Sequence, residues 1–129
     1  MIIKDKLIKG YPLTNKMEFP FECFEVIKRR YVIFYDEKIN RDNMETLLNV
    51  FNENAKKIFS KRKTLIIVGH TNEHFNKKDL VFFNGEDTFI VYFLINDDNN
   101  EIFFNDQRVF WFSVDWKQII KRFNKILNK

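Results

Sequence analysis

Residues 30–69 form the segment that most constrains how this chain can fold. Two runs within it, residues 31–35 (Tyr-Val-Ile-Phe-Tyr) and 64–69 (Thr-Leu-Ile-Ile-Val-Gly), are rich in the β-branched and aromatic residues that favour strands. The apolar residues between the two runs recur every three or four positions, which is the period of one face of an α-helix. They are Met44, Leu47, Leu48, Phe51, Ala55, Ile58 and Phe59. The segment therefore predicts a strand, a helix of about five turns and a second strand.

Both ends of this predicted helix carry sequence signals. Asp42 suits the N-cap position, and Glu45 follows three residues later, as in a capping box. Cations near the C-terminus interact favourably with the helix dipole, and this region has Lys56, Lys57, Lys61, Arg62 and Lys63. The uninterrupted apolar run at residues 65–68 predicts a strand that is covered on both faces.

The residues before this segment allow two interpretations at each of two places. In residues 1–18, Ile2, Ile3, Leu7 and Ile8 fit either a strand or a short helix, and Gly10-Tyr11-Pro12 ends that element. Residues 19–28 fit either a short helix opened by Pro20 or a strand that pairs with residues 31–35 through a turn at 28–30. Because aromatic and β-branched residues are frequent here, we favour the strand.

Short strands and turns alternate after Gly69. Asn84-Gly85 is a strong signal for a tight hairpin, and residues 96–100 (Asn-Asp-Asp-Asn-Asn) form a second turn signal. Successive strands joined by such turns form an antiparallel meander. The predicted strands are residues 80–83, 88–95, 101–104 and 108–112.

A final amphipathic helix is predicted after Asp115. Asp115 suits the N-cap, with Gln118 three residues later. The predicted apolar face is Trp116, Ile119, Ile120, Phe123, Ile126 and Leu127, and the opposite face carries Lys117, Lys121 and Lys125. We expect this helix to pack on the sheet with its lysines in water, although the same pattern suits a helix that lies on a membrane surface.

Together these elements predict an α+β fold, with one mixed or mostly antiparallel sheet of about five to six strands and two main helices. The 129 residues fit a single domain, 1–129. The N-terminus lacks the apolar core of a signal peptide, and no apolar run reaches the roughly 18 to 20 residues of a membrane span. We therefore expect a cytoplasmic protein.

The sequence contains little that points to catalysis. His70, Glu73 and His74 follow a predicted strand and form a possible loop site, but their order differs from the zinc-binding helix motif and no third ligand is evident. Cys23 lies between Phe21 and Phe24, which suits a buried thiol better than a nucleophile. Three scattered glycines cannot form a phosphate-binding loop. We therefore expect no cofactor, no metal and no catalytic residues.

Charge is distributed in blocks along the chain. Residues 1–69 carry a net charge of +5, residues 70–115 carry −6, and residues 116–129 carry +5. The acidic side chains in the predicted turns of the central block are candidates for binding a basic protein partner. They are Glu86, Asp87, Asp97, Asp98, Glu101 and Asp106. The basic clusters at residues 28–30, at 56–63 and on the last helix allow the alternative of a nucleic-acid surface, if they lie on one face.

The segment Phe-Trp-Phe-Ser-Val-Asp-Trp-Lys-Gln-Ile-Ile-Lys-Arg-Phe, residues 110–123, adds a resemblance. A compact α+β chain that ends in a strand, a tryptophan and a short helix resembles small bacterial immunity proteins of contact-dependent or polymorphic toxin systems. The resemblance implies a non-catalytic inhibitor that binds a cognate toxin domain, often a nuclease, and occludes it. The alternatives are a nucleic-acid-associated or phage-type regulatory protein, and a small enzyme that uses the loop at residues 70–74.

Overall fold

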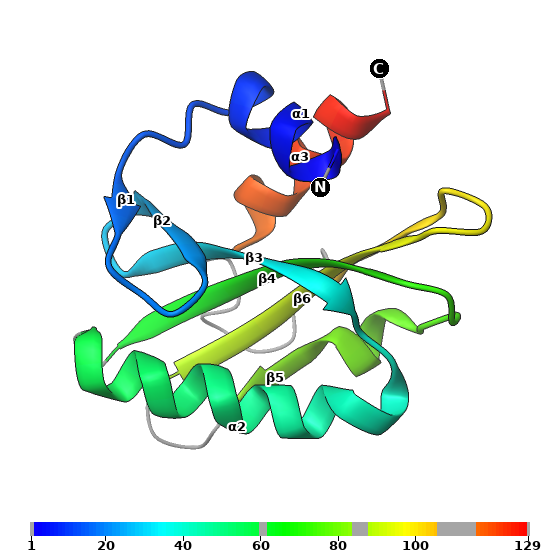
Figure 1. The fold of residues 1–129 in the computed structure, drawn as a ribbon. Coiled ribbons are helices and arrows are strands. Elements are labelled where there is room, and N and C mark those ends of the chain that lie inside the picture. The colour runs from blue at the N-terminus through cyan, green and yellow to red at the C-terminus, as the bar shows by residue number, and fades with distance from the viewer. Residues whose placement is uncertain (1, 60–61, 84–87, 106–115, 129) are drawn as a thin grey trace.

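The computed structural model describes residues 2–59, 62–83, 88–105 and 116–128. In this part of the chain, three α-helices and one short 3-10 helix surround a single seven-stranded mixed sheet (Figure 1). The helices are α1 (Ile2–Gly10), α2 (Arg41–Ile58), η1 (Lys77–Leu80) and α3 (Lys117–Leu127). The strands are β1 (Lys16–Met17), β2 (Glu22–Ile27), β3 (Arg30–Lys38), β4 (Lys63–Thr71), β5 (Val81–Phe83), β6 (Thr88–Asn96) and β7 (Ile102–Phe103).

Three parallel strands form the centre of the sheet. The strand order is β1-β2-β3-β4-β6-β5, in which β4 is parallel to both β3 and β6. The outer strands are antiparallel: β2 to β3, and both β5 and β7 to β6. The predicted α+β class with a mixed sheet is confirmed, and so is the strand–helix–strand unit of β3, α2 and β4.

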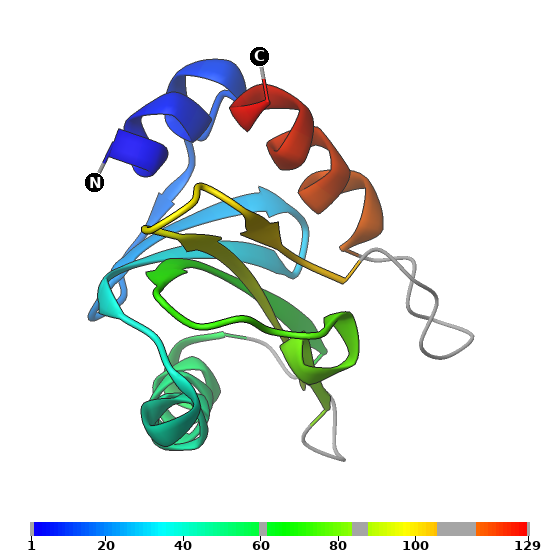
Figure 2. The same ribbon diagram turned by 90° about the vertical axis from the view of Figure 1, so that its right-hand side faces the viewer.

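Alternate residues of the central strands face two separate apolar layers. On β4, Leu65 and Ile67 pack toward α2, whereas Ile66 and Val68 pack toward α1 and α3, and all four are fully buried. Figure 2 shows α2 on one side of the sheet and the two terminal helices on the other. The predicted strand with both faces covered is confirmed, because β4 is the middle strand of a three-layer arrangement.

The prediction for the start of α2 was wrong by two residues. Asn40, not Asp42, is the N-cap: its side chain accepts a hydrogen bond from the Asn43 backbone nitrogen, and the Asn43 side chain accepts one from the Asn40 backbone nitrogen. Both residues offer the same three-residue spacing, so the spacing alone cannot choose between them. Ile58 was also misplaced, since it is 46% exposed and does not join the buried stripe of the helix.

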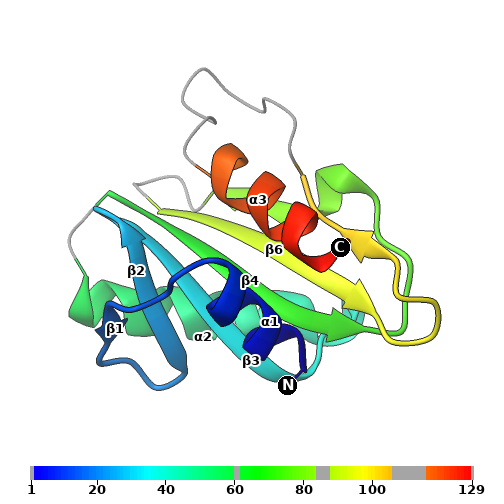
Figure 3. The same cartoon turned by 90° about the horizontal axis from the view of Figure 1, so that it is seen from above.

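Helices α1 and α3 lie side by side over the second face of the sheet (Figure 3). Residues 2–10, which fit either a strand or a helix, form α1 and add a third α-helix to the two predicted. A Cβ on Gly10 would lie 2.7 Å from a side-chain carbon of Ile126, so the close approach of the two helices requires this glycine. No helix in the described part of the chain has the length and apolar composition needed to cross a membrane.

The start of α3 differs from the prediction. Trp116 occupies the N-cap position without a side-chain cap hydrogen bond, and Asp115 lies outside the described residues. The Trp116 ring is fully buried against Phe89, and its Nε1 donates a 2.9 Å hydrogen bond to the Asn105 carbonyl. The tryptophan therefore joins the helix to the sheet core.

Within the described residues, the predicted antiparallel pairs are confirmed for β2 with β3 and for β5 with β6. Residues 22–27 form a strand paired with β3, and Arg29 in the connecting turn has a left-handed backbone, with φ of 69°. The predicted strand at 80–83 begins one residue later, after η1. The Asn84-Gly85 turn and the predicted strand at 108–112 lie outside the described residues.

Candidate functional site

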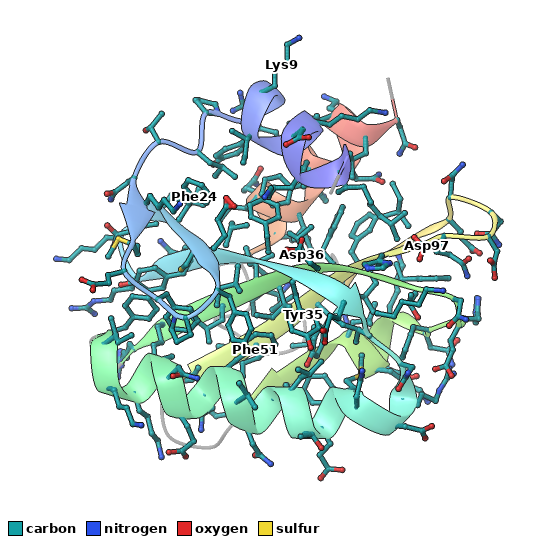
Figure 4. The ribbon with its side chains drawn as sticks, viewed as in Figure 1. Lys9, Phe24, Tyr35, Asp36, Phe51 and Asp97 are labelled. Atoms are coloured by element: carbon teal, nitrogen blue, oxygen red, sulfur yellow. The ribbon has the colours of Figure 1, made fainter. Side chains whose placement is uncertain are left out.

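The strands β3, β4 and β6 are parallel, so their carboxyl ends lie at the same edge of the sheet. The candidate site lies at this edge. We call this the carboxyl edge and define it as residues 36–38, 70–74 and 96–101. Ligands of open sheets that contain parallel strands tend to bind at this end of the strands. Figure 4 marks Asp36 near the end of β3 and Asp97 at the base of the loop that follows β6.

His70 is the centre of this edge. It lies within β4, so the prediction that it follows the strand was wrong. Gly69 was interpreted as the strand end, but it continues the strand, and the Ile39 side chain packs closely against it. The Nδ1 atom of His70 lies 2.7 Å from an Asp97 carboxylate oxygen, and its Nε2 atom lies 2.6 Å from the Asp36 carbonyl oxygen. One imidazole thus joins the ends of three elements.

Both ring nitrogens of His70 face hydrogen-bond acceptors. A neutral imidazole carries one N–H and can donate to one acceptor only, whereas the imidazolium donates to both. Burial lowers the pKa of His70, but the hydrogen bonds to Asp97 and to the Asp36 carbonyl, with the charge of Asp97, outweigh it. The pKa of His70 is therefore raised, although Lys38 opposes this, and the geometry favours the protonated form.

Hydrogen bonds from backbone N–H groups order the loop after β6. Asp97 donates its backbone N–H to the Thr71 carbonyl, and its carboxylate also lies 4.0 Å from Lys38 Nζ. Backbone N–H groups donate to side-chain oxygens two residues earlier at Asp98 (to Asn96) and at Glu101 (to Asn99). These Asx turns order the loop without using the carboxylates of Asp98 and Glu101.

The residues predicted as a loop site are divided between the two faces of the sheet. Glu73 and His74 lie on the α2 side: Glu73 accepts a 2.9 Å hydrogen bond from the Arg41 backbone nitrogen, and the His74 ring packs edge-on against Phe103. His70 faces the α1 and α3 side instead. Among the described residues, no group of three histidine, cysteine or acidic side chains could hold a metal ion.

A cavity of about 640 Å³ opens beside His70, between the strand ends and the two terminal helices. Its apolar wall includes Ile3, Ile95, Ile102 and Leu127, and its polar wall includes Lys6, Asp36, His70 and Asp97. The cavity gives solvent access to the His70–Asp97 pair, whose side chains are 21% and 38% exposed. It does not reach the second histidine.

Cys23 is fully buried on β2. Burial, aided by the charge of Glu25, raises the pKa of its thiol to about 12. A thiol in this environment is protonated near neutral pH and is a poor nucleophile.

Three of the six predicted partner-binding residues come together. Asp97, Asp98 and Glu101 share the exposed loop between β6 and β7, which projects from the sheet in Figure 1. Glu86, Asp87 and Asp106 lie outside the described residues. The structure adds two exposed acids that the sequence analysis missed, Asp36 and Glu37. They stand in a block of net positive charge, but the parallel pairing of β3 with β4 brings them to the same edge.

Two of the three basic clusters also come together, at the opposite end of the sheet. The Arg29 carbonyl accepts a 2.9 Å hydrogen bond from the Thr64 backbone nitrogen, so residues 28–30 lie beside the start of β4. The third cluster, on α3, lies over one face of the sheet. Among the described residues, acidic side chains thus lie at the carboxyl edge, and two of the basic clusters lie at the opposite end of the sheet.

Comparison with protein families and with curated proteins finds no match to this chain. Among solved structures, a chain matches in an assembly described as the refined half-complex from the tetradecameric assembly of Thermococcus gammatolerans McrB AAA+ hexamers with bound McrC. The match has 17% sequence identity and a TM-score of 0.48, and it covers 98% of the present chain and 31% of the other. The present chain thus spans about a third of the length of the chain it matches.

Proposed function

We propose that this chain is a small non-catalytic binding protein of the immunity type, which binds a cognate bacterial toxin domain and occludes it. The observation that carries the proposal is the acidic loop of the carboxyl edge. Asp98 and Glu101 are exposed and form no ion pair with any side chain that the structure describes. Their backbone is already ordered, which reduces the entropy cost of binding.

The arrangement around His70 supports a binding role over a catalytic one. A general base needs a ring nitrogen that is free to take a proton from a substrate. Here Nε2 is engaged by the Asp36 carbonyl and Nδ1 by Asp97. The buried thiol of Cys23 is equally unsuited to attack a substrate. His70 and Cys23 are therefore both committed to the fold.

The chemistry of the edge suits a partner with a basic surface, such as the substrate-binding face of a nuclease domain. The chain as a whole has a net charge of +4, but its positive charge lies mainly at the other end of the sheet and on α3. Complementary local potential can steer association even when the net charges of two proteins have the same sign. An inhibitor that protects the cell producing it would act in the cytoplasm.

Co-purification from the native host tests this proposal, with the wild type compared with D98K/E101K. We expect one protein to co-purify with the wild type, to arrest growth when expressed alone, and to be neutralised when co-expressed with this chain. The charge-reversed variant should bind it at least about 100-fold more weakly, because two attractive contacts become repulsive.

A matched control is E45K/E53K, which makes the same change in net charge on the exposed face of α2. It should bind the toxin with an affinity close to that of the wild type. Equal loss in both variants would assign the effect to net charge, and an unaffected D98K/E101K would remove the loop from the interface.

A further inference from the structure

The opposite end of the sheet has a different surface, which we call the amino edge and define as residues 27–30, 56–59 and 62–63. It contains the turn between β2 and β3, the last turn of α2 and the start of β4. The Phe59 ring, just after α2, stacks on the Tyr31 ring with centroids 3.9 Å apart, which fixes the helix end against the β2–β3 turn. The three segments therefore lie close together, although the β2–β3 turn is distant in sequence from the other two.

This surface carries exposed cations from all three segments. They are Lys28, Arg29, Lys56, Lys57 and Arg62. None of these five side chains forms an ion pair with a carboxylate among the described residues. Glu25 is the nearest acid of β2, and it bonds to the Asn15 amide and to the Arg29 backbone nitrogen rather than to a cationic side chain. No ion pair within the described part of the chain neutralises these five cations, which favours a polyanionic partner.

Exposed apolar side chains lie among these cations. Within the described part of the chain, the large apolar residues with high exposure are Ile27, Ile58 and Phe83, at 48%, 46% and 41%. Ile27 and Ile58 belong to the amino edge, and Phe83 ends β5 at the same end of the sheet, where it is paired with Phe89 near the start of β6. Four strand spacings, about 19 Å, separate β2 from β5. The amino edge therefore offers both charge and apolar contact, the latter from Ile27 and Ile58.

We propose that the amino edge is a second binding surface, whose ligand is single-stranded nucleic acid. The five cations can contact its phosphates, and its bases, which are not stacked within a duplex, can make apolar contacts with Ile27 and Ile58. The contacts involve backbone charge and base faces, so the binding is independent of base sequence. This surface is separate from the acidic loop, and the proposal does not depend on the identity of the toxin.

Fluorescence anisotropy with a labelled single-stranded DNA of about 20 nucleotides tests the proposal at several salt concentrations from about 50 mM upward. The wild type should bind the oligonucleotide, and its affinity should fall steeply as salt increases. K56E/K57E should bind at least about 10-fold more weakly, and the slope of log affinity against log salt should become shallower by about 1.4, which corresponds to two lost phosphate contacts.

The matched control is K121E/K125E, which makes the same change in net charge on exposed positions of α3. It should bind within about threefold of the wild type. Since reversing charge at the end of α2 also acts on the helix dipole, K28E/R62E provides a second test away from the helix, and circular dichroism checks the fold of all three variants.

Several results would overturn the proposal. If K56E/K57E and K121E/K125E weakened binding equally, the effect would arise from net charge and not from the amino edge. Binding that does not depend on salt concentration would exclude phosphate contacts. Tighter binding to a duplex of the same length, or binding only to vesicles of anionic lipid, would assign the edge to another ligand. D98K/E101K should bind the oligonucleotide like the wild type, so failure here and failure of the toxin proposal can be told apart.

Discussion

The carboxyl and amino edges carry opposite charges, and the fold uses these charges differently. At the carboxyl edge, Asp97 is bonded to His70 and lies close to Lys38, so the charge of this carboxylate is compensated inside the molecule. At the amino edge, the exposed lysines and arginines have no described carboxylate partner. Hydrogen bonds and ion pairs thus distinguish charged groups that stabilise the fold from charged groups that are available to a partner.

The same comparison applies within each edge. At the carboxyl edge, Asp97 is structural, whereas Asp98 and Glu101 remain exposed. At the amino edge, Phe59 is stacked and Ile58 beside it is exposed. Neighbouring residues of similar chemistry therefore have different expected effects when they are substituted.

The largest effect is expected at the amino edge, from Phe59→Ala. The ring is stacked between Phe19 and Tyr31, at centroid distances of 5.3 and 3.9 Å. Its removal should lower the free energy of unfolding by about 3 kcal/mol, because it leaves a gap between two aromatic faces. Urea denaturation measures the change. Ile58→Ala is the control and should cost less than about 0.5 kcal/mol, since surface substitutions rarely exceed this. Similar losses in both variants would contradict the distinction between them.

At the carboxyl edge, His70→Leu should lower the free energy of unfolding by about 2 kcal/mol. The substitution removes two hydrogen bonds and leaves the Asp97 carboxylate without its donor. His74→Leu is the matched control, because that ring makes one edge-on contact with Phe103 and is exposed. A loss in the control as large as in His70→Leu would show that the pairing with Asp97 adds little.

Tyr92→Phe, in the core between the two edges, should lower the free energy of unfolding by a smaller amount, about 1 kcal/mol. The Tyr92 hydroxyl, on buried β6, donates a 3.1 Å hydrogen bond to the Met44 carbonyl of α2. Phenylalanine keeps the ring and its packing on Phe82, so the change isolates the hydrogen bond. Thermal unfolding followed by circular dichroism provides the measurement, and an unchanged melting temperature would show that the bond is energetically neutral.

The smallest effect is a pH dependence that arises from His70. Its pKa is raised in the folded state, so its contribution to stability is complete below the unfolded value of about 6.5 and is lost as pH rises through the folded value. Deprotonation removes one of two hydrogen bonds, so the loss should be smaller than in His70→Leu. We expect the melting temperature of the wild type to fall over this range relative to that of His70→Leu. Parallel curves for the two proteins would contradict the assignment.

The sequence predicts the central elements because their patterns leave few alternatives. Residues 31–35, 64–69 and 88–95 are strongly apolar and β-branched, and they form β3, β4 and β6. The helix between β3 and β4 follows from its apolar period. Residues 2–10 were harder, since nine residues with a mixed pattern suit either element until α3 provides a packing partner.

The sites were less predictable, because they depend on which strands lie side by side. Counting charge along the chain placed Asp36 and Glu37 in a basic block, whereas the parallel pairing of β3 and β4 places Asp36 beside His70 and Glu37 at the same edge. The same pairing brings the cluster at 28–30 to the one at 56–63. The pattern of a single sequence predicts where strands occur but not the order in which they pair in the sheet. The two charged edges depend on that order, so blocks of charge along the chain could not reveal them.

The left-handed backbone of Arg29, in the turn at the amino edge, affects both stability and binding. A residue with a Cβ pays roughly 1 kcal/mol for this backbone conformation, and glycine does not. Replacement by glycine should therefore relax the turn and also remove a cation that the proposed ligand would contact. A change that strengthens the fold while weakening binding would reveal a trade-off between stability and function at a single position.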